Sequence, residues 1–388
     1  MIISNELNES LTLKFAQTAR SLKQQGRKII SLGLGEPDFE TPKHIIDATY
    51  KAMLEGFTRY SDSLGLQDLR IAVSEKLQTD NQSKYEPGQI VITPGAKQAI
   101  YLSLCALLLP DDEVINFTPY YVSYVPMAKI AEPRCVIHHI KMNKTDFSID
   151  FEYLESRINS KTKVILLNSP NNPSGKIFNL CELEKISQLA IKHNLFVISD
   201  EIYEKLCFGN EKHISIASLP GMNERTFLVN GFSKAYSMTG WRIGYVACPK
   251  PFISNMNKLQ QHINTNTCTF IQKGAVAALL GEHKFIEEYN LKLKQRFDLL
   301  SKYIAKQDKI KCFIPQAGFF AFADISKLKM DSNDFCSQLL EKTGVAITPG
   351  IACGNDWDDH IRISLAVEED VLASALDLFM DFVNGLVK

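Results

Sequence analysis

The sequence lacks the features by which proteins usually bind nucleic acid or cross a membrane. Its 388 residues include 43 basic and 44 acidic ones without a run of like charges, so neither nucleic acid nor a membrane surface is an expected partner. The longest apolar stretch, AIYLSLCALLLP, is shorter than the ~20 residues that a membrane helix needs. These absences favour a globular protein that acts on small molecules.

Cysteine and histidine patterns of disulfide frameworks and metal sites are also missing. The nine cysteines are odd in number and form no C-x-x-C pair, which is typical of reduced thiols. The eight histidines lack metal-ligand spacing, since the adjacent His138 and His139 would face opposite sides of a strand. The N-terminus MIISNELNES has no basic start before an apolar core, so no signal peptide is expected. We therefore expect a cytoplasmic protein without a structural metal.

Short apolar runs rich in branched residues dominate the middle of the chain. Between about residue 85 and residue 250 they are QIVIT, EVINF, RCVIHHI, KVILLN, LFVIS, TFLVN and WRIGYVA. Several alternate with helix-period stretches such as LCELEKISQLAIKHN. Strands that are apolar on both faces and alternate with helices predict an α/β fold, with a mostly parallel central sheet covered by helices.

The pattern changes from about residue 283. A long charged helix is followed by the short strand candidates KCFIP, FFAFAD and HIRISLA, and then by a closing helix, EEDVLASALDLFMDFV. This succession predicts a second, smaller α+β domain. The chain contains neither a repeat of 20 to 50 residues nor a low-complexity linker.

Polar residues follow several of the strand candidates, where ligands bind in α/β sheets. The turn in PGAKQAIYLSL opens a helix and leaves the backbone N–H groups of Ala96 and Lys97 free for an anion, although a plain helix start has the same pattern. Two further strand candidates are followed by polar or aromatic motifs: TPYYVSY, which contains Tyr121, and SPNNPSG, which contains Asn172. For these, packing and turn chemistry are sufficient explanations.

Two strand candidates end in ionisable residues that need a chemical explanation. LFVIS is followed by Asp200, where an ionised carboxylate is costly unless it meets a cation or a donor, and Tyr203 comes three residues later. TFLVN is followed by Lys234 among small residues, where desolvation would lower the lysine pKa from ~10.4 and make its neutral amine a nucleophile. Arg242 could lower this pKa further and bind a phosphate through two hydrogen bonds.

This combination predicts a Schiff base between Lys234 and a phosphorylated aldehyde. Pyridoxal phosphate fits, because its ring nitrogen needs an acidic partner such as Asp200 and its phosphate needs a helix N-terminus and an arginine. A Rossmann dinucleotide site fits less well, because GLGEPD has Asp38 where a third glycine belongs and starts no obvious helix.

The sequence resembles the class I aminotransferases of the aspartate aminotransferase family, in its bacterial-type branch. The motifs LGEPDF, PGAKQA, NSPNNPSG, SDEIYEKL, SKAYSMTGWRIGY and HIRISLA occur in the order and at the spacing of that family. The resemblance implies pyridoxal 5'-phosphate as cofactor, a homodimer, and the fold type I architecture. It also implies a large cofactor-binding domain of residues 40–282 and a small domain of residues 1–39 with 283–388.

The resemblance assigns cofactor roles at matching positions. Lys234 would bind the cofactor aldehyde and carry the substrate α-proton, and Asp200 would keep the pyridine nitrogen protonated. Tyr203 and Asn172 would hydrogen-bond the cofactor 3-oxygen, and Tyr121 would stack on its ring. The positions that would bind the phosphate are Ala96, Lys97, Ser233, Arg242 and, reaching the site of the neighbouring subunit, Tyr60.

The resemblance also assigns substrate roles. Arg362 would bind the substrate α-carboxylate, with Gly35 lining the same pocket and Asn172 touching the same group. Lys97 would recognise an acidic substrate side chain. Gly231 stands where the family often has a phosphate-binding serine, and Phe320 stands where a tyrosine is usual; the N-terminal segment NESLTLKFAQ also lacks a common proline.

The expected reaction is ping-pong transfer of an amino group from an L-amino acid to a 2-oxo acid. The expected substrates are aspartate and glutamate with 2-oxoglutarate and oxaloacetate. Aminotransferases for aromatic, kynurenine or alanine-type substrates share the scaffold, and so does a lyase of the same fold. A sensor domain fused to a DNA-binding module is disfavoured, because only about 30 residues precede LGLGEPDF.

Overall fold

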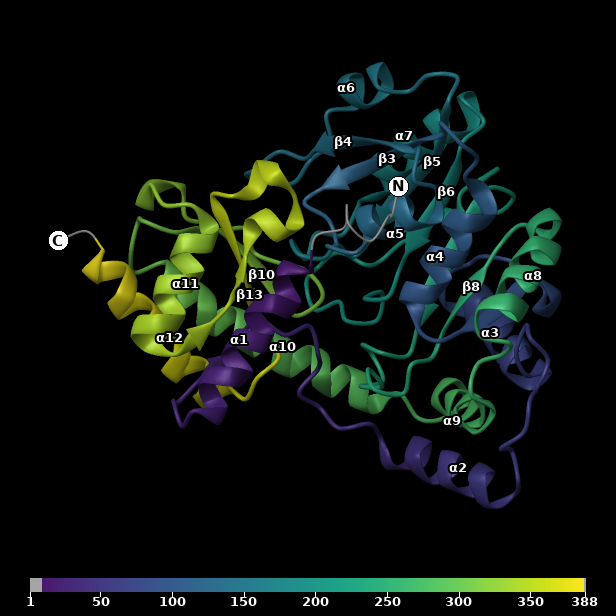
Figure 1. The fold of residues 1–388 in the computed structure, drawn as a ribbon, viewed down its shortest axis with the longest axis horizontal. Helices are drawn as coiled ribbons and strands as arrows, with labels where there is room; N and C mark the ends of the chain where they lie inside the picture. Colours follow the sequence, from purple (N-terminus) through teal and green to yellow (C-terminus); the bar gives the residue numbers. More distant parts are fainter. Residues whose placement is uncertain (1–8, 387–388) are drawn as a thin grey trace.

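The computed structural model describes residues 9–386, which contain three β-sheets (Figure 1). The sheets have seven, four and two strands. The seven-stranded sheet lies in the larger part of the molecule, and the four-stranded sheet lies in the part where purple α1 meets the yellow-green C-terminal helices.

The seven-stranded sheet has the order β2-β8-β7-β6-β5-β3-β4. Its strands are β2 (Ile90–Thr93), β3 (Glu113–Thr118), β4 (Val136–Lys141), β5 (Thr162–Asn168), β6 (Phe196–Asp200), β7 (Thr226–Gly231) and β8 (Gly244–Ala247). Only β8 runs opposite to the other six strands of this sheet, so the sheet is mostly parallel. Each apolar run of the sequence contains one of these strands, which confirms the predicted α/β fold. The run WRIGYVA becomes a strand only from Gly244.

Both faces of this sheet are covered, as β5 illustrates. Val164 and Leu166 pack into one hydrophobic cluster, whereas Ile165 and Leu167 pack into another, because successive strand residues point to opposite faces. The helices of this part are α2 (Lys43–Leu54), α3 (Gln67–Asp80), α4 (Ala96–Leu107), α5 (Tyr124–Ala131), α6 (Phe151–Ser156), α7 (Leu180–Lys192), α8 (Ile253–Ile263) and α9 (Thr269–Leu280).

The smaller part combines both ends of the described chain. Its helices are α1 (Leu11–Gln24), α10 (Lys284–Ile304), α11 (Ser332–Thr343) and α12 (Glu369–Gly385). Its antiparallel sheet β12-β13-β10-β9 is formed by β9 (Lys311–Cys312), β10 (Phe320–Asp324), β12 (Thr348–Pro349) and β13 (His360–Ser364). A parallel pairing of β1 (Ile30–Ser31) with β11 (Val345–Ala346) joins the N-terminal segment to this part.

Short 3₁₀ helices complete the described structure. They are Pro87–Gln89, Ile216–Ser218, Lys250–Phe252, Ser326–Leu328, Gly350–Cys353 and Asn355–Trp357. Across residues 9–386, no helix combines the length and the apolar character needed to cross a membrane.

Candidate active site

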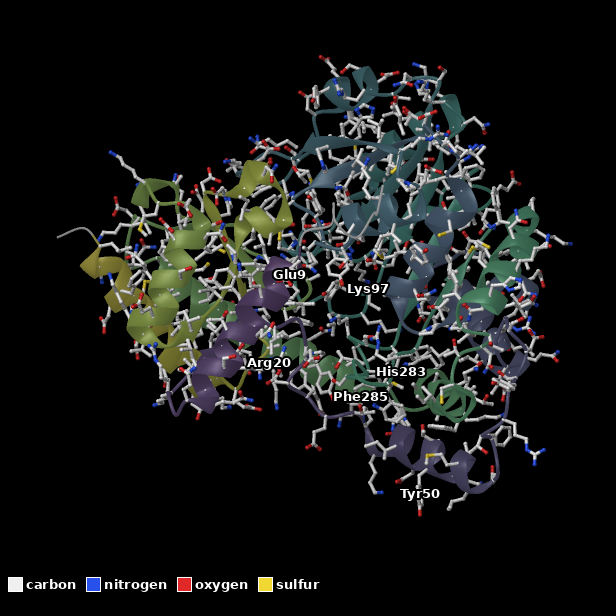
Figure 2. All side chains as sticks on the ribbon, in the orientation of Figure 1. Glu9, Arg20, Tyr50, Lys97, His283 and Phe285 are labelled. Atoms are coloured by element: carbon white, nitrogen blue, oxygen red, sulfur yellow. The ribbon has the colours of Figure 1, made fainter. Side chains whose placement is uncertain are left out.

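Candidate residues from five strands of the large sheet gather at one of its edges. Asp200 ends β6, and Lys234 follows β7, while Tyr121 and Asn172 lie in the turns after β3 and β5. Lys97 lies in the first turn of α4, which follows β2, and Figure 2 shows it on the side that faces the smaller part. Because the carboxyl ends of parallel strands meet at one edge, these separate motifs form one site.

Lys234 combines partial burial with a mixed charge environment. Its Nζ donates a hydrogen bond to the carbonyl oxygen of Gly35 at 2.5 Å. Burial lowers the pKa of Lys234 to about 8; Glu36 opposes this shift, and the nearby Arg362 adds to it. A substantial fraction of the amine is therefore neutral and nucleophilic near pH 8.

Asp200 is a buried carboxylate held by one phenol. The hydroxyl of Tyr124 donates to its Oδ2 at 2.6 Å, and the backbone N–H of Ile202 donates to its Oδ1 at 3.3 Å. Burial raises the pKa of Asp200 to about 6, although the Tyr124 hydrogen bond and Lys234 act to lower it. The group is thus suited to a cationic N–H partner, which would stabilise its ionised form.

Arg242 lies against the N-terminus of α4 because glycine stands at position 95. A Cβ on Gly95, whose φ is +86°, would lie 2.5 Å from Nη2 of Arg242. Arg242 donates to the carbonyl oxygens of Thr239 at 2.9 Å and Pro94 at 3.2 Å. The guanidinium thereby meets the positive end of the helix, where the N–H groups of the first turn have no acceptor within the helix. This arrangement suits a phosphate.

The same turn also packs closely on β8. A Cβ on Gly244 would lie 2.6 Å from the backbone nitrogen of Ala96. Across the β7–β8 pair, a Cβ on Gly231 would lie 2.9 Å from the Cα of Gly244. A serine at position 231 would therefore clash, which gives the departure at this position a steric reason. Ser233 is buried two residues after Gly231.

Arg362 is buried with its guanidinium fixed on several sides. Nη1 donates to Oδ1 of Asn172 at 3.2 Å, and Nη2 donates to the carbonyl oxygen of Gly33 at 2.9 Å and to Oγ1 of Thr348 at 3.2 Å. The ring of Phe320 stacks 4.2 Å from the guanidinium carbon. Within residues 9–386, Nε of Arg362 is buried without a hydrogen-bond partner. A charged donor held in this way is suited to a carboxylate.

Aromatic rings line the space between these charged groups. Tyr203 is buried, and its ring packs edge-on against Phe319 at 5.6 Å between centroids. Burial raises the pKa of Tyr203, so its hydroxyl keeps its proton. Tyr121 packs edge-on against Tyr124 at 5.5 Å, and Nζ of Lys97 lies 5.6 Å from the Tyr121 ring. The arrangement suits a flat ligand ring.

Tyr60 is the candidate that the single chain does not bring into this site. Its side chain is 86% exposed. Among the described residues it makes none of the side-chain hydrogen bonds or ring contacts that join the other candidates.

Among the described residues, one group of side chains outside the candidate site lies close enough together to hold a metal ion. Within residues 9–386, Glu201, Glu204 and His213 place ligand atoms within 4.8 Å of one another. Lys76 pairs with Glu204, and the amide of Asn81 donates to both carboxylates. The carboxylate oxygens of Glu201 and Glu204 therefore already have partners within the protein. The absence of a structural metal stays a prediction.

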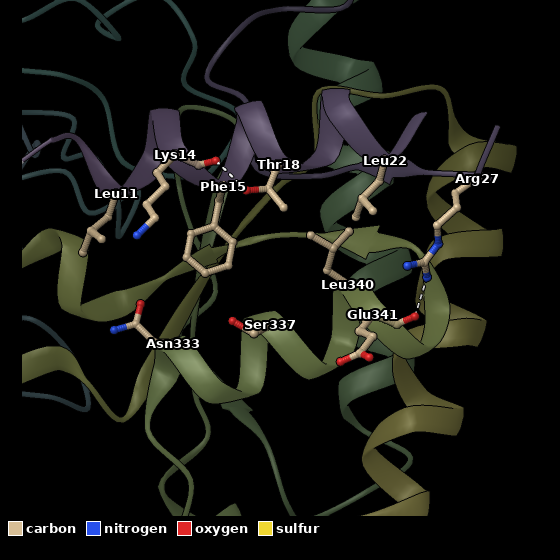
Figure 3. A pocket seen from close by; sticks show the side chains of 10 residues that line it. All are labelled: Leu11, Lys14, Phe15, Thr18, Leu22, Arg27, Asn333, Ser337, Leu340 and Glu341. Atoms are coloured by element: carbon tan, nitrogen blue, oxygen red, sulfur yellow. Dashed lines mark hydrogen bonds between the residues drawn. The ribbon is translucent and has the colours of Figure 1, made fainter. Parts of the chain in front are cut away.

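A cavity of about 550 Å³ between α1 and α11 lies apart from the candidate residues (Figure 3). The ring of Phe15 points from α1 toward α11 across this cavity. The residues that line it are Leu11, Lys14, Phe15, Thr18, Leu22, Arg27, Asn333, Ser337, Leu340 and Glu341. None is a predicted site residue, so the chemistry at the sheet edge does not involve this cavity.

Sequence reasoning missed Tyr124, Thr348 and the carbonyl oxygen of Gly33. Tyr124 could have been found, because it lies three residues after Tyr121 in the same motif that follows a strand candidate. Gly33 had no local signal, since it meets Arg362 across 329 positions of the chain. Thr348 lies 14 positions before Arg362 on a neighbouring strand, and no motif marks it.

Known proteins match this chain over nearly its whole length. A family model for aminotransferase class I and II matches residues 27–379. The aspartate aminotransferase of Bacillus subtilis is 38% identical over 384 residues, covering 97% of this chain and 97% of that protein. The bifunctional aspartate aminotransferase and glutamate/aspartate-prephenate aminotransferase of Petunia hybrida is 40% identical over 387 residues, covering 96% of this chain and 80% of that protein.

A solved structure agrees with these sequence matches. The aspartate aminotransferase from Thermus thermophilus with maleate has a TM-score of 0.93 to this chain at 33% identity, covering 98% of both chains.

Proposed function

This chain belongs to the class I and II aminotransferases, and on that premise we propose that its amino donors and acceptors are dicarboxylic acids. It is a pyridoxal-phosphate-dependent aminotransferase of fold type I, related to the aspartate aminotransferases. The proposed reaction moves the amino group between aspartate or glutamate and 2-oxoglutarate or oxaloacetate by a ping-pong mechanism. The main observation in its favour is a second cation, Lys97, beside Tyr121 in the site that contains Arg362.

The residues present fit pyridoxal 5'-phosphate. The buried Asp200 is matched to a protonated ring nitrogen, and the Arg242 guanidinium, which packs on Gly95 beside the N-terminus of α4, is matched to the phosphate. We propose that the backbone N–H groups of Ala96 and Lys97 join Arg242 there. Ser233 would bind the same phosphate.

Lys234 would bind the cofactor aldehyde and later move the substrate proton. When bound, the cofactor supplies an electron-accepting ring that stabilises the charge left as the substrate loses its α-proton. With a pKa of about 8, Nζ of Lys234 can accept that proton and return it. Tyr203 and Asn172 would hydrogen-bond the 3-oxygen of the cofactor, and Tyr121 would stack on its ring.

Arg362 would orient the substrate. A substrate carboxylate bound by two nitrogens of the Arg362 guanidinium cannot rotate freely. The α C–H bond of the substrate is therefore held toward Lys234. Gly35 leaves room there, since a Cβ at this position would lie 3.2 Å from Cζ of Phe320.

We propose that the protein is a homodimer in which Tyr60 reaches the phosphate of the partner subunit's site. The support is an exposed apolar face on α2, continued by Leu280 of α9: Ile46, Tyr50, Met53, Leu54 and Leu280 are each at least 44% exposed. Figure 2 shows Tyr50 at the outer rim of the molecule. The division into residues 40–282 and residues 1–39 with 283–388, and the cytoplasmic location, remain predictions.

The substrate proposal is tested by following the absorbance of bound cofactor in the purified protein against a panel of amino acids. Aspartate and glutamate should convert the cofactor fastest, and 2-oxoglutarate should reverse the change. Faster conversion by alanine, kynurenine or aromatic amino acids would overturn the dicarboxylate proposal. Pyruvate and ammonia formed without an oxo acid would instead indicate a lyase.

Replacing Lys97 separates its two proposed roles. Lys97→Ser should lower kcat/KM for aspartate about 10- to 100-fold more than for alanine, because a charged hydrogen bond to the substrate side chain is lost. Lys250→Ser, at an exposed position, is the matched control and should leave both values unchanged. Equal losses with the two substrates would show that Lys97 serves only the phosphate.

A further inference from the structure

Residues 33–41, which we call the strap, connect the two parts of the molecule and contact the side chains of Lys234 and Arg362. We propose that Asp38 and Arg296 are positioning residues for amino transfer: by fixing the strap to α10 they place two carbonyl oxygens that orient Lys234 and Arg362. The inference rests on the proposed function, since it concerns how that site is held in place.

The strap meets the two cations through its backbone. The carbonyl oxygen of Gly33 accepts from Nη2 of Arg362 at 2.9 Å, and that of Gly35 accepts from Nζ of Lys234 at 2.5 Å. Arg362 lies in β13 and Lys234 lies in the turn after β7. The strap therefore hydrogen-bonds side chains from two separate elements.

The strap has no regular structure of its own to fix these carbonyls. Residues 32–42 contain neither helix nor strand. The backbone of Leu32 is held by backbone hydrogen bonds with Ala346 and Ser364, both at 2.7 Å, but the backbone of residues 33–41 makes no such bond to another described element. Beyond Leu32, side-chain contacts to other elements therefore fix the strap.

Asp38 and Arg296 form the strongest of these contacts. Nη1 and Nη2 of Arg296 donate to Oδ1 and Oδ2 of Asp38 at 2.8 and 2.7 Å, a two-bond fork in which Arg296 is only 2% exposed. Nη1 also donates to the carbonyl oxygen of Leu365, at 3.2 Å, just after the strand that contains Arg362. Because burial excludes water, this pair has a fixed geometry that an exposed pair would not keep.

Further contacts fix the rest of the strap. Phe39 stacks on Tyr289 of α10 with ring centroids 3.8 Å apart, and the hydroxyl of Tyr289 donates to the carbonyl oxygen of Glu40 at 2.9 Å. Oγ1 of Thr41 donates to the carbonyl oxygen of Ser237 at 2.6 Å, three residues after Lys234. The strap thus links α10 to the turn that contains the lysine.

The test compares Asp38→Asn with the wild-type holoenzyme in two assays, amino transfer and binding of maleate by calorimetry. Maleate is a dicarboxylate that cannot donate an amino group, so its dissociation constant reports how well Arg362 is oriented. Asp38→Asn should weaken maleate binding about tenfold, or about 1.4 kcal/mol. It should lower kcat/KM about 100-fold, because small misplacements of reacting groups have large effects on rate.

A matched control lies on the same helix. Lys294 and Asp298 form an ion pair at 3.2 Å with side chains 55% and 58% exposed. Lys294→Ala should leave the maleate dissociation constant and kcat/KM within about twofold, because exposed pairs contribute little. If Asp38→Asn does not fold, Arg296→Lys keeps the charge but loses the fork, and about fivefold weaker maleate binding is then the expected result.

A double variant separates positioning from stability. In Asp38→Asn, the buried Arg296 keeps only the exposed Glu368, 4.0 Å away, as an acidic partner. Adding Arg296→Met removes this buried charge and should recover part of the melting temperature without recovering maleate affinity. The inference is overturned if maleate affinity returns together with stability. It is also overturned if Asp38→Asn lowers the melting temperature but leaves the maleate dissociation constant and kcat/KM unchanged. A wild-type protein that transfers no amino group would contradict the proposed function, whereas variants that bind maleate and react like wild type contradict only this inference.

Discussion

At the scale of single residues, the reactivity of Lys234 depends on groups from several segments. Its pKa is lowered to about 8, mainly by burial and also by Arg362 and Arg242, whereas Glu36 and Asp200 act to raise it. These neighbours lie at positions from 36 to 362, so the local sequence around the lysine cannot set its pKa. The amine is kept nucleophilic by the fold.

Replacing Glu36 should make Lys234 more reactive toward the cofactor. Glu36→Gln removes a charge that raises the lysine pKa, so the curve of cofactor uptake by the apoprotein against pH should move to lower pH. The uptake rate at pH 7 should rise about two- to threefold, because a larger share of the amine is then neutral. Stopped-flow absorbance measures it, with Glu40→Gln on the same strap as control. An unchanged curve would show that Glu36 does not act on Lys234.

At the scale of elements, the proposed phosphate site depends on the turn between β2 and α4. Gly95 lets Arg242 approach the first turn of α4, and Gly244 lets β8 pack against Ala96. Each contact needs a position without a side chain, because a Cβ would come within 2.6 Å of another atom. The proposed phosphate site depends on these close approaches, because they place an arginine beside the helix N-terminus.

Adding one methyl group to this turn should weaken cofactor binding. Gly95→Ala would place a Cβ 2.5 Å from Nη2 of Arg242 at a residue with φ of +86°, so both the arginine and the backbone would have to shift. The dissociation constant for pyridoxal phosphate, from spectroscopic titration, should rise about tenfold or more. Gly88→Ala adds a methyl group in open space and should bind like wild type. Equal affinities in the two variants would contradict the proposed phosphate site.

At the scale of the whole molecule, the exposed apolar face of α2 and the high exposure of Tyr60 have one common explanation. Leu54 is 72% exposed and Tyr60 is 86% exposed, an unfavourable arrangement for an isolated chain in water. A second copy would cover the face and bring Tyr60 to the neighbouring site, since closed two-fold pairs use the same surface on both subunits.

A charge on this face should separate the subunits. Leu54→Asp is expected to give a monomer in light scattering and to lower the specific activity about tenfold or more, because a buried unpaired carboxylate would oppose association. Leu109→Asp is the control, since Leu109 is 66% exposed on a different element and should leave the assembly intact. A Leu54→Asp protein that remains dimeric would exclude α2 from the interface.

Much of the fold and part of the site could be predicted from local patterns. Each apolar run proved to contain a strand of the large sheet, because residues buried on both faces must be apolar. In the run WRIGYVA, Trp241 and Arg242 lie in a turn instead, with Arg242 at φ +55°. Leu180, in the helix-period stretch LCELEKISQLAIKHN, is exposed at the first position of α7. Such deviations occur where a strand or helix begins, and periodicity cannot locate those points.

The sequence by itself determined the candidate groups and their order along the chain: an amine, a carboxylate, two arginines and a helix N-terminus. Only the tertiary structure decided which groups act on one another. Arg296 meets Asp38 across 258 positions of the chain, and Tyr124 meets Asp200 across 76. Local periodicity records whether a residue is buried, but the partner of a buried charge depends on how distant elements pack.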